Sequence, residues 1–205
     1  MHFWPQNFDE LSSEEKLLFG AYRSLLERGY QGTTSRSIAE AAGVNQGLIH
    51  HYYGSQENLF ARMIYRLHSE AHRIVAEAHT RRDVLEFFCQ AGASSGTMES
   101  DICSLGREMP SVRAAMTEIM ACKQRDISEV FGFQRPEDVT IFLGALRGIQ
   151  IELAINPELD QKACLDRLAD LLLGGAHVLD EPLDWDPSER LKAVPLTPAT
   201  PARAH

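Results

Sequence analysis

Side chains that can read DNA bases and hold phosphates gather in residues 33–59 of this chain. The amide of Gln46 can bond N6 and N7 of an adenine together in the major groove. Arg36 is the only arginine in the stretch, and a guanidinium bonds a base edge or a phosphate. The chain contains no H-E-x-x-H, G-x-S-x-G, P-loop or paired-carboxylate motif, so the sequence predicts a binding protein and not an enzyme.

Two short helices joined by a tight turn are expected to position these side chains. Thr33 and Thr34 are good N-caps for a helix from Ser35 to Ala42, because their hydroxyl oxygens can accept from backbone N–H groups of its first turn. Gly43 suits the C-cap, since glycine tolerates a positive φ. Asn45 then caps a second helix that starts near Gln46.

The apolar residues of the two helices have the spacing of inner faces. Ile38, Ala39 and Ala42 can share the inner face of the first helix, and Ile49 and Tyr53 lie four residues apart in the second. The polar residues are left outside. This division is typical of a helix-turn-helix, which packs its apolar face inside and presents donors and acceptors to a DNA groove.

Residues 14–65 resemble the N-terminal domain of the TetR family of bacterial transcriptional regulators. The positions that carry the resemblance are Ala21, Leu25, Gly29-Tyr30, Thr33, Ile38-Ala39, Ala42-Gly43-Val44-Asn45, Gly47, Ile49, Tyr52-Tyr53, Ser55 and Glu57-Asn58-Leu59. They cover about a quarter of the chain. The resemblance implies DNA binding by a homodimer whose second domain binds a small-molecule effector, most commonly as a repressor that the effector releases.

Eleven residues are the candidates for contact with double-stranded DNA. They are Thr34, Ser35, Arg36, Asn45, Gln46, Gly47, Leu48, His50, His51, Tyr52 and Gln56. Some have an alternative role: Leu48 either touches a thymine methyl or is a half-exposed hydrophobe, and Tyr52 either holds phosphate, as the resemblance implies, or packs. His50 and His51 point about 100° apart on a helix, so they are poor joint metal ligands, and no metal or cofactor is expected.

Two of these positions depart from the family pattern. The family usually has tyrosine in place of His50 and lysine in place of Gln56, and both commonly contact the DNA backbone. Without the lysine, non-specific affinity should fall and its salt dependence should flatten by about one charge. At neutral pH His50 is mostly an uncharged donor or acceptor, and at low pH it can carry charge.

The charge balance places the acidity in the second part of the chain. The 205 residues carry a formal charge of −9, which argues against a generally basic coat for nucleic acid. Residues 1–75 hold seven basic and eight acidic residues, and residues 76–205 hold 13 and 21. A nearly neutral reading domain is therefore expected beside an acidic second domain.

Neither a membrane anchor nor a disulfide framework is indicated. No segment reaches 18 apolar residues and the N-terminus lacks a signal pattern, so a cytoplasmic protein is expected. Cys89, Cys103, Cys122 and Cys164 are too far apart for a zinc motif. Small buried hydrophobes are the simpler interpretation, and a redox-sensing thiol is the alternative.

The sequence predicts an all-α protein of about nine helices. Its expected parts are an N-terminal extension (1–11), a three-helix helix-turn-helix domain (12–65), a regulatory and dimerisation domain (66–179) and a Pro-rich, loosely ordered tail (180–205). The last two long helices, about 136–155 and 160–179, carry more apolar surface than a small domain covers. They are expected to form an intermolecular four-helix bundle.

An apolar effector pocket is expected in the second domain, although for any single residue ordinary core packing is the favoured interpretation. The candidates are Phe88, Cys103, Met109, Met116, Met120, Phe142 and Leu146. A different class of function also stays open. The chain could keep the helix-turn-helix fold as a protein-interaction module that has lost tight DNA binding, which Gln56 and the nearly neutral reading domain would fit.

Overall fold

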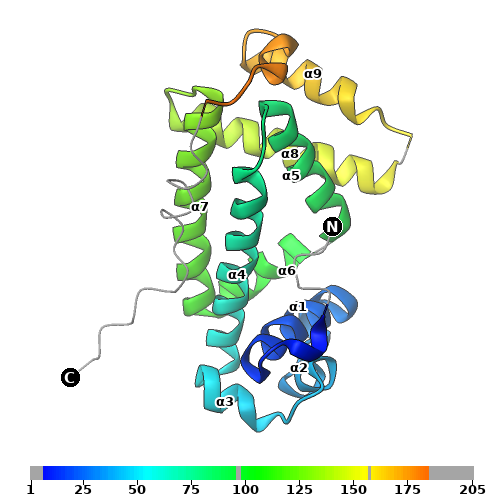
Figure 1. Ribbon diagram of the computed structural model, residues 1–205, viewed down its shortest axis with the longest axis vertical. Helices are drawn as coiled ribbons and strands as arrows, with labels where there is room; N and C mark the ends of the chain where they lie inside the picture. Colours follow the sequence, from blue (N-terminus) through cyan, green and yellow to red (C-terminus); the bar gives the residue numbers. More distant parts are fainter. Residues whose placement is uncertain (1–6, 96–97, 157, 185–205) are drawn as a thin grey trace, which may run out of the picture. The chain divides into compact units, whose positions relative to one another are not determined.

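The described residues form helices joined by short connections (Figure 1). The computed structural model describes residues 7–95, 98–156 and 158–184. Over these residues it contains no strand, which confirms the predicted all-α class with nine α-helices. The helices are α1 Ser13–Gly32, α2 Ser35–Ala42, α3 Gly47–Tyr53, α4 Gln56–Ala76, α5 Arg81–Ser95, α6 Met98–Glu108, α7 Pro110–Phe131, α8 Pro136–Ile155 and α9 Gln161–Leu172. Two 3-10 helices, η1 Phe8–Glu10 and η2 Ala176–Asp180, complete the list.

The described residues form two compact units. The head unit holds residues 7–71 and 98–119, and the body unit holds 72–95, 120–156 and 158–184. The chain passes from one unit to the other within α4 and within α7. The expected domain boundaries at residues 11, 65 and 179 stay predictions, and the expected tail lies outside the described residues from 185 onward.

A capping box starts α1. The hydroxyl of Ser12 accepts the backbone N–H of Glu15, and the Glu15 carboxylate accepts the backbone N–H of Ser12. Such a capping box satisfies two donors that the first turn of a helix leaves unpaired. Gly29 has φ 66° and interrupts the helical conformation before a further turn reaches Gly32.

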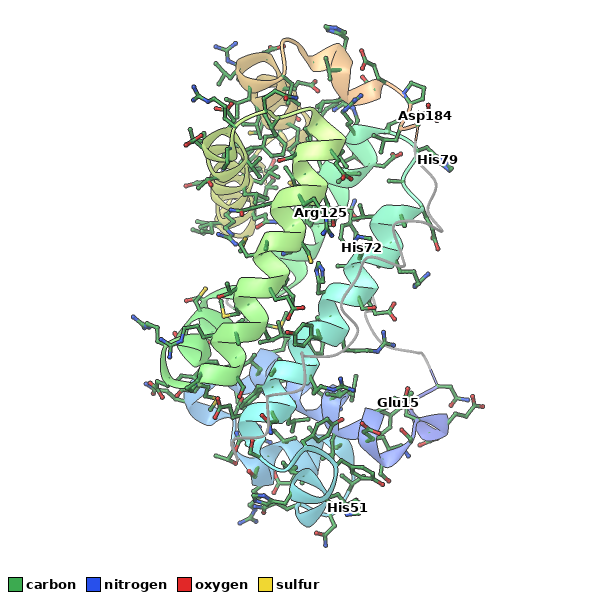
Figure 2. All side chains as sticks on the ribbon, turned by 90° about the vertical axis from the view of Figure 1, so that its left-hand side faces the viewer. Glu15, His51, His72, His79, Arg125 and Asp184 are labelled. Atoms are coloured by element: carbon green, nitrogen blue, oxygen red, sulfur yellow. The ribbon has the colours of Figure 1, made fainter. Side chains whose placement is uncertain are left out.

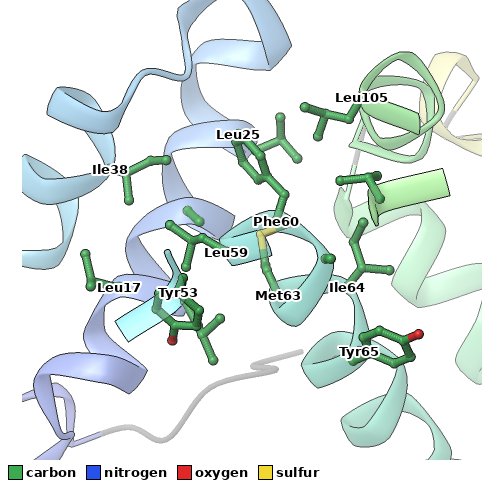
Figure 3. Packing of buried hydrophobic residues seen from close by; sticks show 14 of the residues in the cluster. Leu17, Leu25, Ile38, Tyr53, Leu59, Phe60, Met63, Ile64, Tyr65 and Leu105 are labelled. Atoms are coloured by element: carbon green, nitrogen blue, oxygen red, sulfur yellow. The ribbon is translucent and has the colours of Figure 1, made fainter. Parts of the chain in front are cut away.

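The head unit has one hydrophobic core to which all of its helices contribute. Figure 3 shows part of this cluster, in which Leu17, Leu25, Ile38, Tyr53 and Leu59 lie near one another. Residues of α6 and the start of α7, such as Leu105 and Val112, belong to the same cluster. The core therefore fixes α2 and α3 against a larger scaffold than the three-helix domain that the sequence predicts.

A glycine brings α1 and α2 close together in the head unit. A Cβ on Gly20 would lie 2.5 Å from the carbonyl oxygen of Ile38 and 2.8 Å from the Cβ of Ala42. These separations are well below van der Waals contact. Only glycine fits here without moving the backbone, so this residue sets the spacing at which α2 packs.

The body unit has its own core around α5, α8 and α9. Its fully buried members include Leu85, Phe142 and Leu165. The predicted single last helix over about 160–179 is wrong, because α9 ends at Leu172 and η2 follows separately. Gly174 and Gly175 have φ values of 86° and 151°, which an α-helix cannot accommodate.

Candidate nucleic-acid interface

The inner and outer faces of α2 and α3 separate as a helix-turn-helix requires. Ile38, Ala42, Ile49 and Tyr53 are buried in the head core. The Tyr53 hydroxyl donates to the backbone carbonyl of Glu14 at 2.8 Å, which ties α3 to α1. Burial, with the negative charge of the Glu14 carboxylate, raises the pKa of Tyr53 well above its ordinary value.

The outer face of α3 carries the expected polar residues. Gln46, Gly47, His50, His51 and Tyr52 are all exposed. Tyr52 is 42 % exposed and meets the ring of His51 edge-on, with 4.8 Å between ring centroids. Figure 2 shows His51 at the outer surface of the head. These side chains can meet a groove without any change in the packing beneath them.

The turn before α3 differs by one residue from the prediction. Gln46, and not Asn45, directly precedes the first helical residue, Gly47. The amide oxygen of Asn45 still accepts the backbone N–H of Gly47 at 2.8 Å, so it does the work of a cap. Leu48 is half-buried and packs against the head core.

The start of α2 is held by a network of hydroxyl groups. Thr34 and Ser37 form a capping box, in which Thr34 Oγ1 accepts the backbone N–H of Ser37 at 3.1 Å. Buried Ser24 lies 2.8 Å from the Ser37 hydroxyl, and Thr33 donates to the carbonyl of Gly29 at 2.7 Å. This network fixes the end of α2 that carries the predicted DNA contacts Thr34, Ser35 and Arg36.

Gln56 bonds within the head unit. Its Oε1 accepts the hydroxyl of Ser35 at 2.8 Å, and its Nε2 donates to the carbonyl of Thr33 at 3.3 Å. The first residue of α4 thereby bridges to the first residue of α2. In this arrangement both Gln56 and Ser35 stabilise the head, although the sequence predicts them as DNA contacts.

The guanidinium of Arg36 is paired with a carboxylate that sequence reasoning missed. Arg36 lies 3.1 Å from Glu40, and its side chain is 84 % exposed. Arg28 approaches the same carboxylate at 3.8 Å. The spacing of four residues between Arg36 and Glu40 is the signal that could have revealed the pair. A phosphate would have to compete with Glu40 for Arg36, and exposed pairs of this kind are weak.

The expected pocket residues fall into both units. Phe88, Phe142 and Leu146 join the body core, whereas Met109 and Met116 pack against the head core. Of the remaining two, Cys103 is exposed and Met120 is half-buried. The pocket stays a prediction.

The four cysteines have different environments. Cys89 and Cys122 are buried, Cys103 is exposed and Cys164 is half-buried. Burial raises the pKa of the Cys89 thiol to about 11, so this thiol is a poor nucleophile at neutral pH.

Two other kinds of site were sought in the described part of the chain. Over residues 7–95, 98–156 and 158–184 no three His, Cys, Asp or Glu side chains are grouped as metal ligands. Within the same ranges no helix is both long and apolar enough to span a bilayer.

The packing of α1 to α3 defines a domain of the helix-turn-helix class, and comparison with known proteins gives the family that this domain matches. Residues 17–63 match the family described as bacterial regulatory proteins, tetR family. The match covers the helix-turn-helix domain and not the rest of the chain.

A curated relative and two solved structures are similar to the chain. The HTH-type transcriptional repressor AcnR of Corynebacterium glutamicum is 45 % identical over 49 residues, which are 24 % of this chain and 26 % of AcnR. The chain thus spans about a quarter of the length of the curated relatives it matches.

The two solved structures share the fold over most of the chain. The transcriptional regulator RHA1_ro04179 of Rhodococcus sp. Rha1 has a TM-score of 0.64 at 19 % identity, over 83 % of this chain and 98 % of its own. The multidrug binding protein EbrR, solved with imidazole, has a TM-score of 0.58 at 16 % identity, over 80 % and 96 %.

Proposed function

We propose that the chain is a ligand-responsive, DNA-binding transcriptional regulator. It acts as a repressor that stays bound to its operator until a small apolar effector releases it. The observation that carries this proposal is the division of α3, with Ile49 and Tyr53 buried and Gln46, His50 and Tyr52 exposed. A recognition helix is inserted into the major groove with its N-terminal residues against the base edges. At that end of α3 stand the N-cap residue Gln46 and the first helical residue, Gly47.

Regulation of transcription is supported by the matched domain. AcnR is named a repressor, and the family model matches residues 17–63, which include α2 and α3. The TetR family is one of regulators and not of enzymes. Release by a small molecule is supported more distantly, by the shared fold of EbrR, which is named a multidrug binding protein.

A homodimer is the second element of the proposal, and a stripe along α8 supports it. Ile141, Gly144, Gly148, Ile151 and Ile155 follow one another at spacings of three and four, the pattern of a helix-helix seam. Their positions are all exposed, and the three isoleucines are 56 %, 60 % and 74 % exposed. Among the described residues, and apart from the adjoining residues and nearby backbone of α8 itself, no atom lies within 4 Å of a Cβ placed on either glycine.

The stripe has the symmetry that a contact between two copies needs. Ile141 and Ile151 lie five residues on either side of position 146, and Gly144 and Gly148 lie two residues on either side. In an isologous contact between antiparallel helices, each residue meets its mirror position. Isoleucine would therefore face isoleucine and glycine would face glycine, which allows a close crossing of the two helices.

The proposed mechanism follows from this pairing. A palindromic operator presents half-sites about 34–36 Å apart, or a multiple of that distance, to the two heads of a dimer. An effector that binds better to a dimer with a different spacing between its heads lowers the fraction of operator that is occupied. A tenfold change needs a difference of about 1.4 kcal/mol in its binding to the two states.

The test is a gel shift with the DNA immediately upstream of the chain's own gene, at two salt concentrations, with Gln46→Ala beside the wild type. Sequence-specific binding that weakens with salt, and that loses specificity in the variant, supports operator reading. If no DNA of any sequence is bound in a salt-dependent way, the proposal fails.

A second candidate function is a protein-interaction module with the helix-turn-helix fold. The observation that favours it is the internal use of Gln56 and the pairing of Arg36 with Glu40, which leave few fixed cations for phosphate. Retained salt-dependent DNA binding in the same gel shift would count against this alternative.

A further inference from the structure

The imidazole of His50 caps the C-terminal end of the recognition helix. Its Nδ1 lies 2.9 Å from the carbonyl oxygen of Gly54, and the backbone N–H of Gly54 donates to the carbonyl of His50 at 3.0 Å. A carbonyl oxygen can only accept a hydrogen bond. Nδ1 must therefore carry the proton in this contact.

This contact decides what a neutral His50 can offer to DNA. Neutral imidazole has one N–H, and the other nitrogen is an acceptor. Since His50 uses its N–H on Gly54, its exposed Nε2 presents a lone pair, which repels a phosphate oxygen. Only after Nε2 gains a proton can His50 donate to phosphate, and the resulting bond is charge-assisted.

The helices around α3 supply no net positive charge. Over α1, α2 and the head part of α4 (residues 56–71), six carboxylates are matched by six basic side chains: Glu14, Glu15, Glu27, Glu40, Glu57 and Glu70 against Lys16, Arg23, Arg28, Arg36, Arg62 and Arg66. Several of them are paired with one another, among them Arg36 with Glu40 and Arg23 with Glu27. α3 itself contains neither lysine nor arginine.

The neighbour of His50 is chemically similar but arranged differently. His51 is exposed and meets Tyr52 edge-on. The described contacts of His51 include no bond from its ring to a backbone carbonyl. A neutral His51 can turn either tautomer toward a phosphate and needs no second proton to donate.

We propose that His50 binds the DNA phosphate only as the imidazolium, so that each head takes up one proton when it binds its operator. This inference rests on the proposed function. Acidification would then strengthen operator binding, and a rise in pH would weaken it. The chain would report pH through the same helix that reads the DNA.

The first experiment measures Kd at pH 6 and pH 8, at constant ionic strength, by fluorescence anisotropy. The probe is a labelled duplex recovered by in vitro selection from a random-sequence pool. We expect the wild-type Kd to be about tenfold higher, or more, at pH 8, as the loss of a charge-assisted bond implies. His50→Gln should lose most of this difference, because a glutamine amide donates at every pH.

The matched control is His51→Gln, which should retain the pH dependence of the wild type. Wild-type protein also gives a test without substitution. Titration calorimetry in two buffers with different heats of ionisation reports the protons taken up on binding, and near pH 7 we expect net uptake.

The outcomes separate the two proposals. Specific binding with equal Kd at pH 6 and pH 8, or a pH dependence that His50→Gln retains, overturns the inference and leaves the regulator intact. If the pool yields no specific duplex at either pH, the proposed function fails and the inference fails with it.

Discussion

Replacement of Ile151 by aspartate should separate the proposed dimer without unfolding the subunit. Ile151 is 60 % exposed on α8 within a single chain, so the fold gains little from its side chain. In the proposed seam it faces Ile141 of a second copy. An aspartate there would place a carboxylate in an apolar contact, where it has no partner.

The magnitude follows from the exposed fraction. Complete burial of an isoleucine is worth about 1.5–3 kcal/mol, so covering the exposed 60 % of Ile151 contributes about 1–2 kcal/mol. Each residue occurs twice in a symmetric dimer, which doubles the loss to about 2–4 kcal/mol. At 1.4 kcal/mol per tenfold change, the dimer Kd should rise by about 30-fold to 1,000-fold.

Sedimentation velocity over a dilution series measures this Kd, and circular dichroism checks that the subunit stays folded. The matched control is Leu26→Asp, which introduces the same charge at a hydrophobic residue of α1 that is 42 % exposed. The control should dimerise as the wild type does. The reasoning is refuted if Ile151→Asp leaves the dimer Kd unchanged, or if the control weakens association equally.

Two further predictions concern the stability of the units. Gly20→Val should lower the melting temperature by several degrees. The added Cβ would lie 2.5 Å from the carbonyl oxygen of Ile38, and overpacking of this kind costs about 1–3 kcal/mol of stability. An unchanged melting temperature would contradict the packing of α1 on α2. In the body unit, the hydrogen bond from Lys162 and the ion pair with Arg82 hold the pKa of Asp166 below its usual range. A lowered folded-state pKa contributes stability that is present above the ordinary pKa of aspartate, about 4, and is lost as the pH falls through the folded-state pKa. Asp166→Asn should therefore melt earlier than the wild type at pH 7, and the difference should shrink as the pH is lowered below about 4. Equal melting temperatures at pH 7 would show that the pair contributes nothing.

The sequence was informative about helices whose ends are set by local chemistry. The predicted helix from Pro136 to Ile155 agrees with α8, because proline suits a first helical turn. The predicted helix through residues 160–179 was wrong, because its apolar spacing continues past Gly174 while the backbone does not. Hydrophobic periodicity reports which side chains favour a core, and only a strong local preference, such as glycine at positive φ, reports where a helix must stop.

The candidate site was predictable in its members and not in their partners. Types and spacing were enough to place Gln46 outside and Ile49 inside, because the helical period fixes the two faces. They could not show that Gln56 bridges to Ser35 across 21 residues, since such a bond depends on how α4 meets α2.

The bond from His50 to Gly54 shows where that limit affects function. The two residues are four positions apart, a separation at which side chains on a helix often meet. Whether the imidazole reaches the free carbonyl at the helix end, however, depends on the rotamer of His50 and on the turn at Gly54. From sequence, a histidine in a recognition helix is simply a polar residue that can donate or accept. Once its N–H is committed to a carbonyl, it can donate to DNA only when it carries a second proton. In the proposed contact, a hydrogen bond within the protein thereby decides whether the bond from His50 to the DNA phosphate depends on pH.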